Sequence, residues 1–362
     1  MERLLQFGTG RFLRGFVEAF IDDDEQVRAR EGQPPARRVT AVETSGSGMA
    51  SRLAVQGGAY RLRICGLDDG RVVDTSRTIR VIDRTVDSSL DLASLTDASL
   101  DPELTFIVSN TTEAGYAPGA FPRRLASVLL ARARAGLPGL VILPCELIED
   151  NGARLRALVA EEMGSLAAGR EAQAHVLEAN VWATTLVDRI TTAPRPRPGG
   201  SDDLDVIVEP YASWVIEVAS HVPLIEHACV TRTTDVRPFA LRKLRILNGA
   251  HTALVGRTRG MEVRLVREAL EDAGIAGWLE DLLREEIVPT LDDRIVDGEA
   301  FAASVLERFR NPFLDHQLAD IAVNHDQKVA LRLLPTYREH VRRFERPPIR
   351  LEALLREEGV IS

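Results

Sequence analysis

The sequence has almost no lysine. Of its 45 lysine and arginine residues, only two, Lys243 and Lys328, are lysines. Arginine serves surface charge and ion pairs well, but its guanidinium stays protonated at any working pH. A lysine amine can lose its proton when it is buried, and it can then pass a proton to or from a ligand. The scarcity of lysine therefore makes both residues candidates for a chemical role.

Cysteine pairs, positive net charge and long apolar runs are also missing. Cys65, Cys145 and Cys229 lie far apart without CxxC or CxxH spacing, which fits a reducing compartment and gives no structural zinc site. The net charge of −9 and the pI near 5.4 argue against general nucleic-acid binding. No apolar run reaches the ~20 residues that cross a bilayer, and the chain opens directly into a strand pattern rather than a signal peptide. We therefore expect a cytoplasmic protein that binds neither nucleic acid nor membranes.

Short apolar runs alternate with amphipathic segments early in the chain, which predicts a parallel sheet with helices on both faces. Strands are expected at 4–7, 39–42, 60–65, 72–73, 78–82, 104–109, 140–143, 205–208 and 214–218, and helices at 12–22, 123–135 and 152–163. From about residue 238 the pattern is helical, at 239–258, 262–273, 276–286, 298–308, 313–323 and 326–344. The expected fold class is α/β: an N-terminal Rossmann-type doubly wound sheet followed by a mostly α-helical C-terminal domain.

The strongest break in composition is the proline- and glycine-rich stretch 193–203, which we interpret as an exposed loop. Strand patterns continue beyond it, so the domain boundary is placed later. The prediction is a dinucleotide-binding domain over residues 1–235 and a helical substrate and catalytic domain over residues 236–362.

A glycine-rich turn follows the first predicted strand. Gly8, Thr9 and Gly10 lead through Arg11 and Phe12 into the first predicted helix, where glycines let the backbone approach a pyrophosphate. The third glycine of the usual GxGxxG pattern is absent. The turn predicts a cofactor site, and a glycine turn that binds nothing is the alternative.

Two polar residues follow other strands of the same predicted sheet. Glu43 ends the second strand, where a carboxylate could bind the ribose diol and favour NAD over NADP by repelling a 2′-phosphate. Asn110 follows the strand at 104–109, and loops at strand carboxyl ends line the ligand crevice. Both are candidate cofactor contacts, with an ordinary turn residue as the alternative for each.

Lys243, Asn248 and His251 lie in one apolar run. On an α-helix they fall at about 0°, 140° and 80° around the axis and span ~12 Å along it, so all three could reach one small ligand. Such a trio suits hydride transfer at a secondary alcohol, with Lys243 as base or acid and the other two holding the oxygen. No Tyr-x-x-x-Lys pair occurs, so that competing catalytic design is absent. No His, Cys and Glu set has catalytic-zinc spacing, so no metal is expected. A histidine packed in the core is the alternative for His251.

The sequence resembles a known family, the polyol-specific long-chain dehydrogenases, also called the mannitol dehydrogenase family. The pattern of Lys243, Asn248 and His251 matches that family's catalytic signature. The other matching stretches, which run in order over nearly the whole chain, are 6–14, 42–45, 109–115, 144–152, 186–190, 246–255 and 308–312. They are most similar to a branch that acts on hexuronates. The resemblance implies NAD(H)-dependent, metal-independent interconversion of D-tagaturonate and D-altronate in hexuronate breakdown.

The resemblance also suggests substrate contacts. Thr184 stands where the mannitol branch carries an asparagine that helps to hold the carbonyl oxygen. A hexuronate carboxylate requires a cation, and Arg308, His316 and Lys328 lie downstream in the helical region. Lys328, the second rare amine, is the favoured carboxylate partner, with a helix-surface charge as its alternative.

Other functions stay open at this point. Fructuronate reductase and mannitol 2-dehydrogenase are the nearest alternatives, because the sequence does not fix substrate stereochemistry. Relatives continue as helix beyond the position of Ser362, so a dinucleotide-binding protein without turnover is the alternative of another class. A small sugar acid is the expected partner, and the family is compatible with a monomer.

Overall fold

The computed structural model describes residues 1–111, 113–166, 168–194, 204–291 and 293–361. The chain forms two compact units, one of Met1–Ile64 with Asp74–Val236 and one of Cys65–Val73 with Arg237–Ser362. Residues 65–73 thus group with the second unit, although the sequence pattern put them in the first domain. The loop predicted at 193–203 lies, apart from its first two residues, outside the described ranges.

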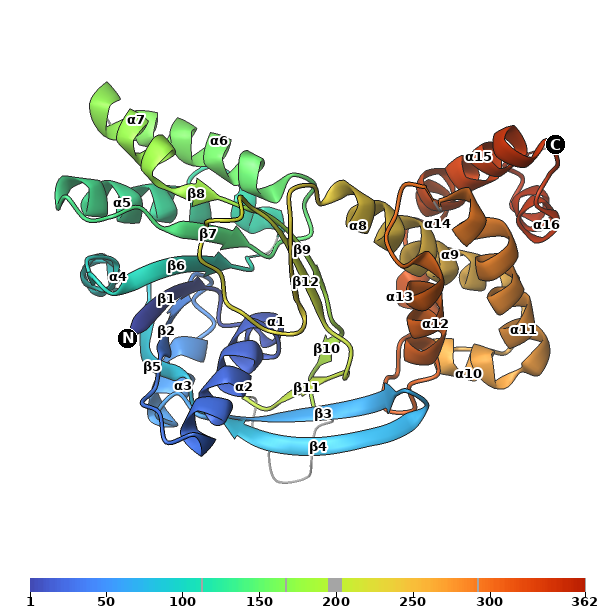
Figure 1. The fold of residues 1–362 in the computed structure, drawn as a ribbon, viewed down its shortest axis with the longest axis horizontal. Helices are drawn as coiled ribbons and strands as arrows, with labels where there is room; N and C mark the ends of the chain where they lie inside the picture. The colour runs from blue at the N-terminus through green and yellow to red at the C-terminus, as the bar shows by residue number, and fades with distance from the viewer. Residues whose placement is uncertain (112, 167, 195–203, 292, 362) are drawn as a thin grey trace. The chain divides into compact units, whose positions relative to one another are not determined.

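A six-stranded parallel sheet forms the centre of the first unit. Its strands, in spatial order, are β5 (Ile82–Asp87), β2 (Arg37–Glu43), β1 (Glu2–Phe7), β6 (Leu104–Ser109), β7 (Val141–Pro144) and β8 (Val181–Trp182). The chain builds outward from β1 to β5 and then crosses back to β6, so the strand order reverses between β1 and β6 (Figure 1). This is the doubly wound sheet that the sequence predicts, and the expected fold class is confirmed.

Helices pack on this sheet because successive side chains of each buried strand point to opposite faces. On β1, Leu4 packs in a core cluster with Phe16 and Phe20, whereas Leu5 belongs to a second cluster that includes Leu125. The helices of this unit are α1 (Arg11–Arg14), α2 (Val17–Arg30), α3 (Met49–Val55), α4 (Leu92–Ser99), α5 (Phe121–Arg134), α6 (Asn151–Ser165) and α7 (Arg170–Ala179), with the short turn η1 (Glu113–Tyr116). Helices α4 to α7 all contribute to the second cluster.

Two smaller sheets lie mainly in this unit. One has the order β10 (Thr191–Thr192), β11 (Val206–Val208), β3 (Tyr60–Asp68) and β4 (Arg71–Ile79), and the other β13 (Val230–Thr233), β12 (Ser213–Glu217) and β9 (Thr184–Asp188). The parts of β3 and β4 within residues 65–73 group with the second unit. The strand predicted at 78–82 is divided between β4 and β5, because the chain passes there from one sheet to another.

Gly15 interrupts the helix predicted at 12–22. A Cβ atom at this position would lie 2.6 Å from Val208 and 3.0 Å from Val206, so only glycine fits against β11. The chain turns there, and α2 begins at Val17.

The second unit is helical. Its elements are α8 (Arg237–Arg242), η2 (Lys243–Leu247), α9 (Asn248–Arg257), α10 (Val266–Glu271), α11 (Ala273–Asp281), η3 (Leu282–Ile287), η4 (Val288–Thr290), α12 (Gly298–Phe309), α13 (Leu318–Ala322), α14 (His325–Lys328), η5 (Val329–Leu333), α15 (Leu334–Phe344) and α16 (Ile349–Glu357). The helix predicted at 313–323 starts late, because the preceding chain runs beside residues 264–266: Val266 N donates to His316 O at 3.0 Å, and Leu318 N donates to Arg264 O at 2.9 Å.

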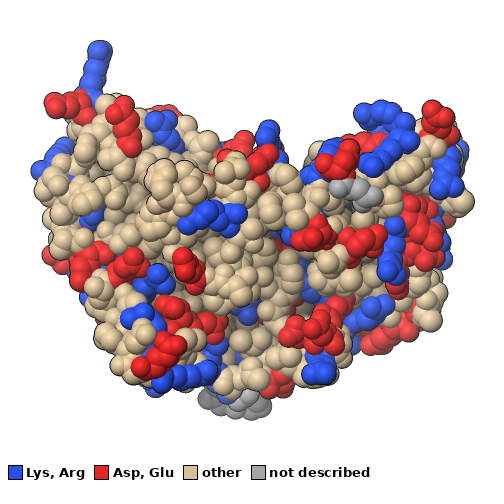
Figure 2. Space-filling model, viewed as in Figure 1, with Lys and Arg blue, Asp and Glu red and all other residues tan. Residues whose placement is uncertain are grey.

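Basic and acidic side chains are interspersed on the face drawn in Figure 2. Positive and negative side chains are therefore close to one another on that face, and no extended area there carries charge of one sign only. Among the residues that the structure places, no helix is both long and apolar enough to cross a membrane.

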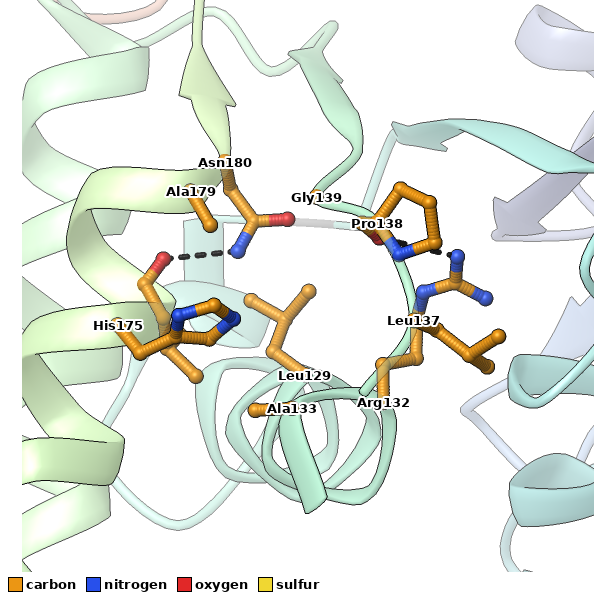
Figure 3. Close-up of a pocket in the computed structure, with 10 residues that line it drawn as sticks. Leu129, Arg132, Ala133, Leu137, Pro138, Gly139, His175, Ala179 and Asn180 are labelled. Carbon is orange, nitrogen blue, oxygen red and sulfur yellow. Dashed lines mark hydrogen bonds between the residues drawn. The ribbon is translucent and has the colours of Figure 1, made fainter. Parts of the chain in front are cut away.

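A small pocket lies among α5, α7 and the turn that leads into β7 (Figure 3). Its polar groups are bound to the protein itself. Asn180 Nδ2 donates to Val176 O at 2.8 Å, and Arg132 Nη2 donates to Pro138 O at 3.1 Å. None of the predicted site residues lines this pocket, which we assign to packing.

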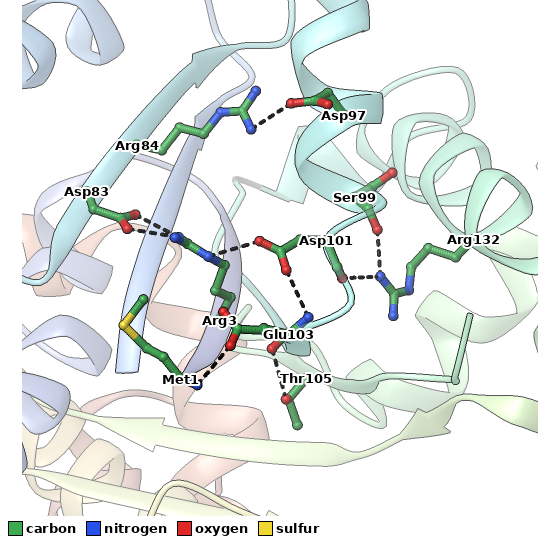
Figure 4. A network of polar contacts seen from close by, with 10 residues as sticks. All are labelled: Met1, Arg3, Asp83, Arg84, Asp97, Ser99, Asp101, Glu103, Thr105 and Arg132. Carbon is green, nitrogen blue, oxygen red and sulfur yellow. Dashed lines mark hydrogen bonds and ion pairs between the residues drawn. The ribbon is translucent and has the colours of Figure 1, made fainter. Parts of the chain in front are cut away.

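Arg132 also contributes to a polar network at the amino end of the sheet (Figure 4). Its Nη1 donates to the carbonyl oxygens of Ser99 at 2.6 Å and Asp101 at 3.0 Å. Arg3 pairs with Asp83 at 2.8 Å and with the Asp101 carboxylate at 2.9 Å. Solvent-accessible pairs of this kind contribute at most about 1 kcal/mol each. The buried sheet therefore carries most of the stability of this unit.

A histidine–carboxylate pair ties the segment before β13 to α2. His227 Nε2 lies 3.4 Å from Asp23 Oδ2, and the imidazole stacks on Phe20 with ring centroids 4.4 Å apart. The hydrogen bond to Asp23, and after it the side chain of Cys229, raise the pKa of His227 to about 9. The backbone N–H of Cys229, which donates to Nδ1 at 3.1 Å, opposes this shift because it requires Nδ1 as an acceptor. The folded protein therefore holds a proton here that the unfolded chain releases near pH 6.5.

This pair predicts a loss of stability in mild alkali. Below about pH 6.5 both states bind the proton and the pair contributes fully, and the contribution fades as the pH rises towards 9. Urea unfolding from pH 6 to 9.5 is expected to show a decline of roughly 3 kcal/mol from this group. His227→Gln should remove that decline, whereas His221→Gln, at an exposed position, should keep it. A decline of the same size in His227→Gln would contradict the assignment.

Candidate active site

The glycine turn lies where the strand order of the sheet reverses. Gly8 N donates to Val42 O at 2.9 Å, and Asn110 N donates to Phe7 O at 3.0 Å, so the loops after β1 and β6 meet there. Gly8 has φ +118°, and a Cβ atom on it would lie 2.8 Å from Asn110 O. The conformation and the close approach both require glycine. The structure thus brings Gly8 and Asn110 together at the edge where doubly wound folds bind ligands.

Gly10 differs from Gly8 in its surroundings. It is exposed, and a Cβ atom on it would have no atom within 4 Å. Thr9 is buried, Arg11 is exposed, and the Phe12 ring stacks on Phe16 with centroids 4.8 Å apart. The backbone of the turn is therefore accessible at Gly10, whereas Thr9 and Phe12 are packed against the protein.

A buried polar network holds the turn from below. Gln6 Nε2 donates to Gly8 O at 3.0 Å and to Glu18 Oε1 at 2.7 Å, and Arg14 Nε donates to Thr9 O at 3.1 Å. Burial raises the pKa of the Glu18 carboxyl, although hydrogen bonds from Tyr60 and Gln6 oppose the shift.

Tyr60 joins this network through its hydroxyl group. The tyrosine oxygen lies 2.6 Å from both Glu18 Oε2 and Arg14 O, but its hydroxyl has only one proton to donate. The hydroxyl therefore donates one proton that the Glu18 carboxylate and the Arg14 carbonyl share as acceptors. Sequence patterns gave no sign of this network, because its members are scattered along the chain.

Glu43 has contacts other than those the sequence suggested. Its side chain is fully buried, and its carboxylate accepts hydrogen bonds from Ser47 Oγ at 2.7 Å, Gly48 N at 2.9 Å and Ala50 N at 2.8 Å. The carboxylate thus closes the loop after β2 and binds the first turn of α3 instead of facing solvent. Glu43 thus shapes this loop, and its predicted ribose contact stays a prediction.

A second buried carboxylate, Glu146, organises the loop that carries Asn110. It accepts hydrogen bonds from Ser109 Oγ at 3.0 Å, Thr111 N at 2.8 Å and the Tyr116 hydroxyl at 3.1 Å. Burial raises the pKa of Glu146. Asn110 Nδ2 itself donates to Cys145 O at 2.7 Å. Sequence reasoning missed Glu146, although the segment 144–152 stood out.

Thr184 begins β9, where it pairs with Glu217 of β12, and it is half-buried. The adjoining strand segment is held by Asn151, which is fully buried: its Nδ2 donates to Thr185 O at 3.0 Å, and its Oδ1 accepts from Thr185 N at 2.9 Å. Asn151 therefore fixes the backbone next to Thr184.

In the second unit, the chain carries a π-turn where an ordinary helix was expected. Residues Lys243–Leu247 form η2, and the N–H of Asn248 donates to the carbonyls of both Lys243 and Leu244. Bonds from i to i+5 place residues five apart one above the other. Asn248 therefore follows Lys243 along the same side, and His251 lies three residues further on the same face of α9. The 140° offset expected between Lys243 and Asn248 is corrected accordingly.

His251 is surrounded by aromatic and cationic groups. Its ring centroid lies 4.2 Å from Phe309 and 4.9 Å from His316. Burial, followed by His316, Arg308 and Arg332, holds the pKa of His251 well below its usual range. The ring is therefore neutral near pH 7.

The protonation of the two ring nitrogens of His251 follows from their partners. The ring bonds the backbone of Leu247, and Nε2 is buried without a hydrogen-bond partner in the described chain. The proton therefore lies on Nδ1, and Nε2 is a free acceptor.

The other predicted substrate residues gather on neighbouring elements of the same unit. Arg308 is buried near the end of α12. Burial, and then Arg308, lower the pKa of His316, while Asp320 opposes the shift. Lys328 Nζ donates to Ile321 O at 2.7 Å, so this amine binds the carboxyl end of α13. Arg332, which sequence reasoning passed over because arginine is so common in this chain, lies beside Asn248.

Family models match nearly the whole chain. The mannitol dehydrogenase Rossmann domain matches residues 2–225, and the mannitol dehydrogenase C-terminal domain matches residues 235–352. An altronate oxidoreductase of Bacillus subtilis (strain 168) is 34% identical over 97% of this chain and 77% of its own length. An altronate oxidoreductase of Klebsiella pneumoniae (strain 342) is 34% identical over 92% of this chain and 74% of its own.

Solved structures share the fold. A D-sorbitol dehydrogenase in substrate-free form superimposes with a TM-score of 0.84 at 22% identity, covering 98% of this chain and 79% of that one. A Pseudomonas fluorescens mannitol 2-dehydrogenase, in a ternary complex with NAD and D-mannitol, gives a TM-score of 0.74 at 20% identity, with 98% and 78% covered. At these identities the likeness concerns the fold.

The fold and the matched domain models define a dehydrogenase with a Rossmann-type domain. More particularly, the chain belongs to the mannitol dehydrogenase family. It is an oxidoreductase that acts on the CH–OH group of a polyol or sugar acid. The family predicted from the sequence is confirmed.

Proposed function

We propose that the protein interconverts D-tagaturonate and D-altronate with NAD(H). The observation that carries this proposal is the similarity, over more than nine-tenths of the chain, to relatives named altronate oxidoreductase. The cationic groups around His251 add chemical support, because a hexuronate differs from a hexitol by its carboxylate.

The first unit binds the cofactor at the glycine turn. Gly8 allows the close approach to the Asn110 loop, and the open backbone at Gly10 leaves the space that a pyrophosphate requires. Thr9, Arg11, Phe12 and Asn110 complete the contacts, while Glu43 shapes the adjoining loop. NAD(H) held by these residues would supply the hydride acceptor in oxidation and the hydride donor in reduction.

Lys243 transfers the proton. In altronate oxidation its neutral amine takes the hydroxyl proton as the hydride leaves the same carbinol carbon and the C=O bond forms. In reduction its ammonium gives the proton back to the oxygen. The Asn248 amide donates a hydrogen bond to that oxygen, and the neutral His251 ring accepts one from a substrate hydroxyl at Nε2.

In the second unit, Arg308, His316 and Lys328 are the proposed contacts of the substrate carboxylate, and in the first unit Thr184 is the proposed hydroxyl contact. A carboxylate is held most strongly by charge-assisted hydrogen bonds. The family alternatives, fructuronate reductase and mannitol 2-dehydrogenase, differ in this requirement or in hydroxyl configuration.

A substrate panel tests the proposal. Tagaturonate, fructuronate, fructose and mannitol are assayed by absorbance with NAD(H) and with NADP(H). The expected result is turnover of tagaturonate with NADH at a kcat/KM at least about 30-fold above that of fructose, since buried charged contacts are worth about 2 kcal/mol or more. Equal turnover of fructose or mannitol would exclude the uronate assignment, and preference for fructuronate would select the other reductase. Binding of NADH without any turnover would favour the non-catalytic alternative.

A further inference from the structure

Arg332 lies directly against the helix that carries the proposed catalytic residues. It belongs to η5, and its Nη1 lies 3.2 Å from Thr252 Oγ1 and 3.5 Å from Asn248 O. These two acceptors are one helical turn apart on α9, and His251 immediately precedes Thr252. The guanidinium is therefore fixed beside the turn that presents Asn248 and His251.

Among the residues that the structure places, the charge of Arg332 has no carboxylate counter-ion. Several other arginines of this unit pair with carboxylates, such as Arg294 with Glu339 at 2.6 Å and Arg343 with Asp293 at 2.9 Å. Within the placed residues, no carboxylate lies within 4.0 Å of Arg332. The side chain is nonetheless half-buried, and burial lowers its pKa.

A second cation lies nearby and is also without a carboxylate partner in the described part of the chain. Lys328 sits one helical turn earlier, and its pKa is lowered by burial and then by Arg332. Its amine already donates to Ile321 O. Two half-buried positive charges without an acidic partner cost folding free energy in the unliganded protein. A bound anion would offset that cost.

We propose that Arg332 is the residue that binds the carboxylate of the sugar-acid substrate, with Lys328 as a supporting charge. Only Nη1 is used by described residues, so the Nε–Nη2 edge remains for a bidentate pair with a carboxylate. This assignment rests on the proposed function and replaces Lys328 as the main partner. Arg332 would then determine substrate specificity, because a neutral ketose has no carboxylate to bind the Nε–Nη2 edge.

The test compares a keto-uronate with the neutral ketohexose of the same hydroxyl configuration. Arg332→Gln is expected to raise KM for tagaturonate by about 100-fold. It should change KM of the neutral ketohexose, or its Ki where turnover is slow, by less than about 3-fold. Arg332→Lys, which keeps the charge but loses the fork, should give an intermediate rise of about 10-fold. Arg338→Gln, at an exposed position on α15, is the matched control and should behave as wild type.

Several outcomes overturn the assignment. An unchanged KM for tagaturonate in Arg332→Gln excludes the carboxylate contact. A parallel loss of activity with both substrates shows that Arg332 only supports the turn at Asn248. The same conclusion follows if Arg332→Gln fails to fold and Arg332→Lys has a wild-type KM. Wild-type protein that fails to reduce tagaturonate removes the proposed function itself, and the assignment with it. That failure is recognised because it appears before any variant is made.

Discussion

Lys243→Ala is expected to lower kcat for tagaturonate reduction by at least about 100-fold, the usual effect of removing a positioned proton donor. The reason is that the alkoxide formed when hydride reaches the carbonyl carbon has no other positioned acid: His251 is neutral with its proton directed at Leu247, and an amide such as Asn248 cannot release a proton. The loss should appear in kcat, measured at saturating NADH and substrate, with a smaller change in KM.

Lys243→Arg separates proton transfer from charge. Arginine retains the positive charge but does not give up its proton, so the same large loss is expected. Near wild-type activity in Lys243→Arg would show that the residue acts only through its charge. Thermal unfolding should be measured for both variants, since Lys243 begins the π-turn and a change in folding must be excluded.

Gly10→Ala is expected to raise the Kd for NADH by at least about 10-fold without destabilising the protein. The new methyl group would meet no protein atom within 4 Å, and φ at Gly10 is −68°, which alanine adopts freely. Any effect must therefore come from the space that the ligand fills. Fluorescence titration with NADH and a thermal melt measure the two quantities separately.

Gly8→Ala is the matched variant with the opposite signature. Its φ of +118° and the 2.8 Å approach to Asn110 O are unfavourable for any side chain, so a loss of roughly 1–3 kcal/mol in unfolding free energy is expected. Wild-type NADH affinity in Gly10→Ala would contradict the placement of the cofactor at this turn.

Much of the fold follows from local sequence pattern. The runs at β1, β2, β6 and β7 are apolar on both faces, as strands of a covered parallel sheet must be, and they were predicted to within a few residues. The glycine turn and Asn110 could be assigned to the ligand edge for the same reason, since topology fixes where strand carboxyl ends meet.

The features that the sequence did not predict come from contacts between distant residues. Glu43 ends a strand as expected, but backbone donors in the following loop bind its carboxylate. Lys328 is one of only two lysines in the sequence, and in the structure its amine donates to a backbone carbonyl near the end of α13. The π-turn at Lys243 has no periodicity signal, because its residues are as apolar as those of an α-helix. Arg332 is half-buried beside Asn248 and has no carboxylate partner within the described ranges, and composition does not reveal such surroundings.

The measurement that tests the account most directly is the pH dependence of kcat in both reaction directions for wild type and Lys243→Ala. If Lys243 is the acid in reduction and the base in oxidation, the wild-type reduction rate falls with rising pH while the oxidation rate increases. Lys243→Ala should be slow in both directions and should lose both dependences. Wild-type profiles that change in the same sense in the two directions, or a variant that keeps them, would contradict the role of the amine.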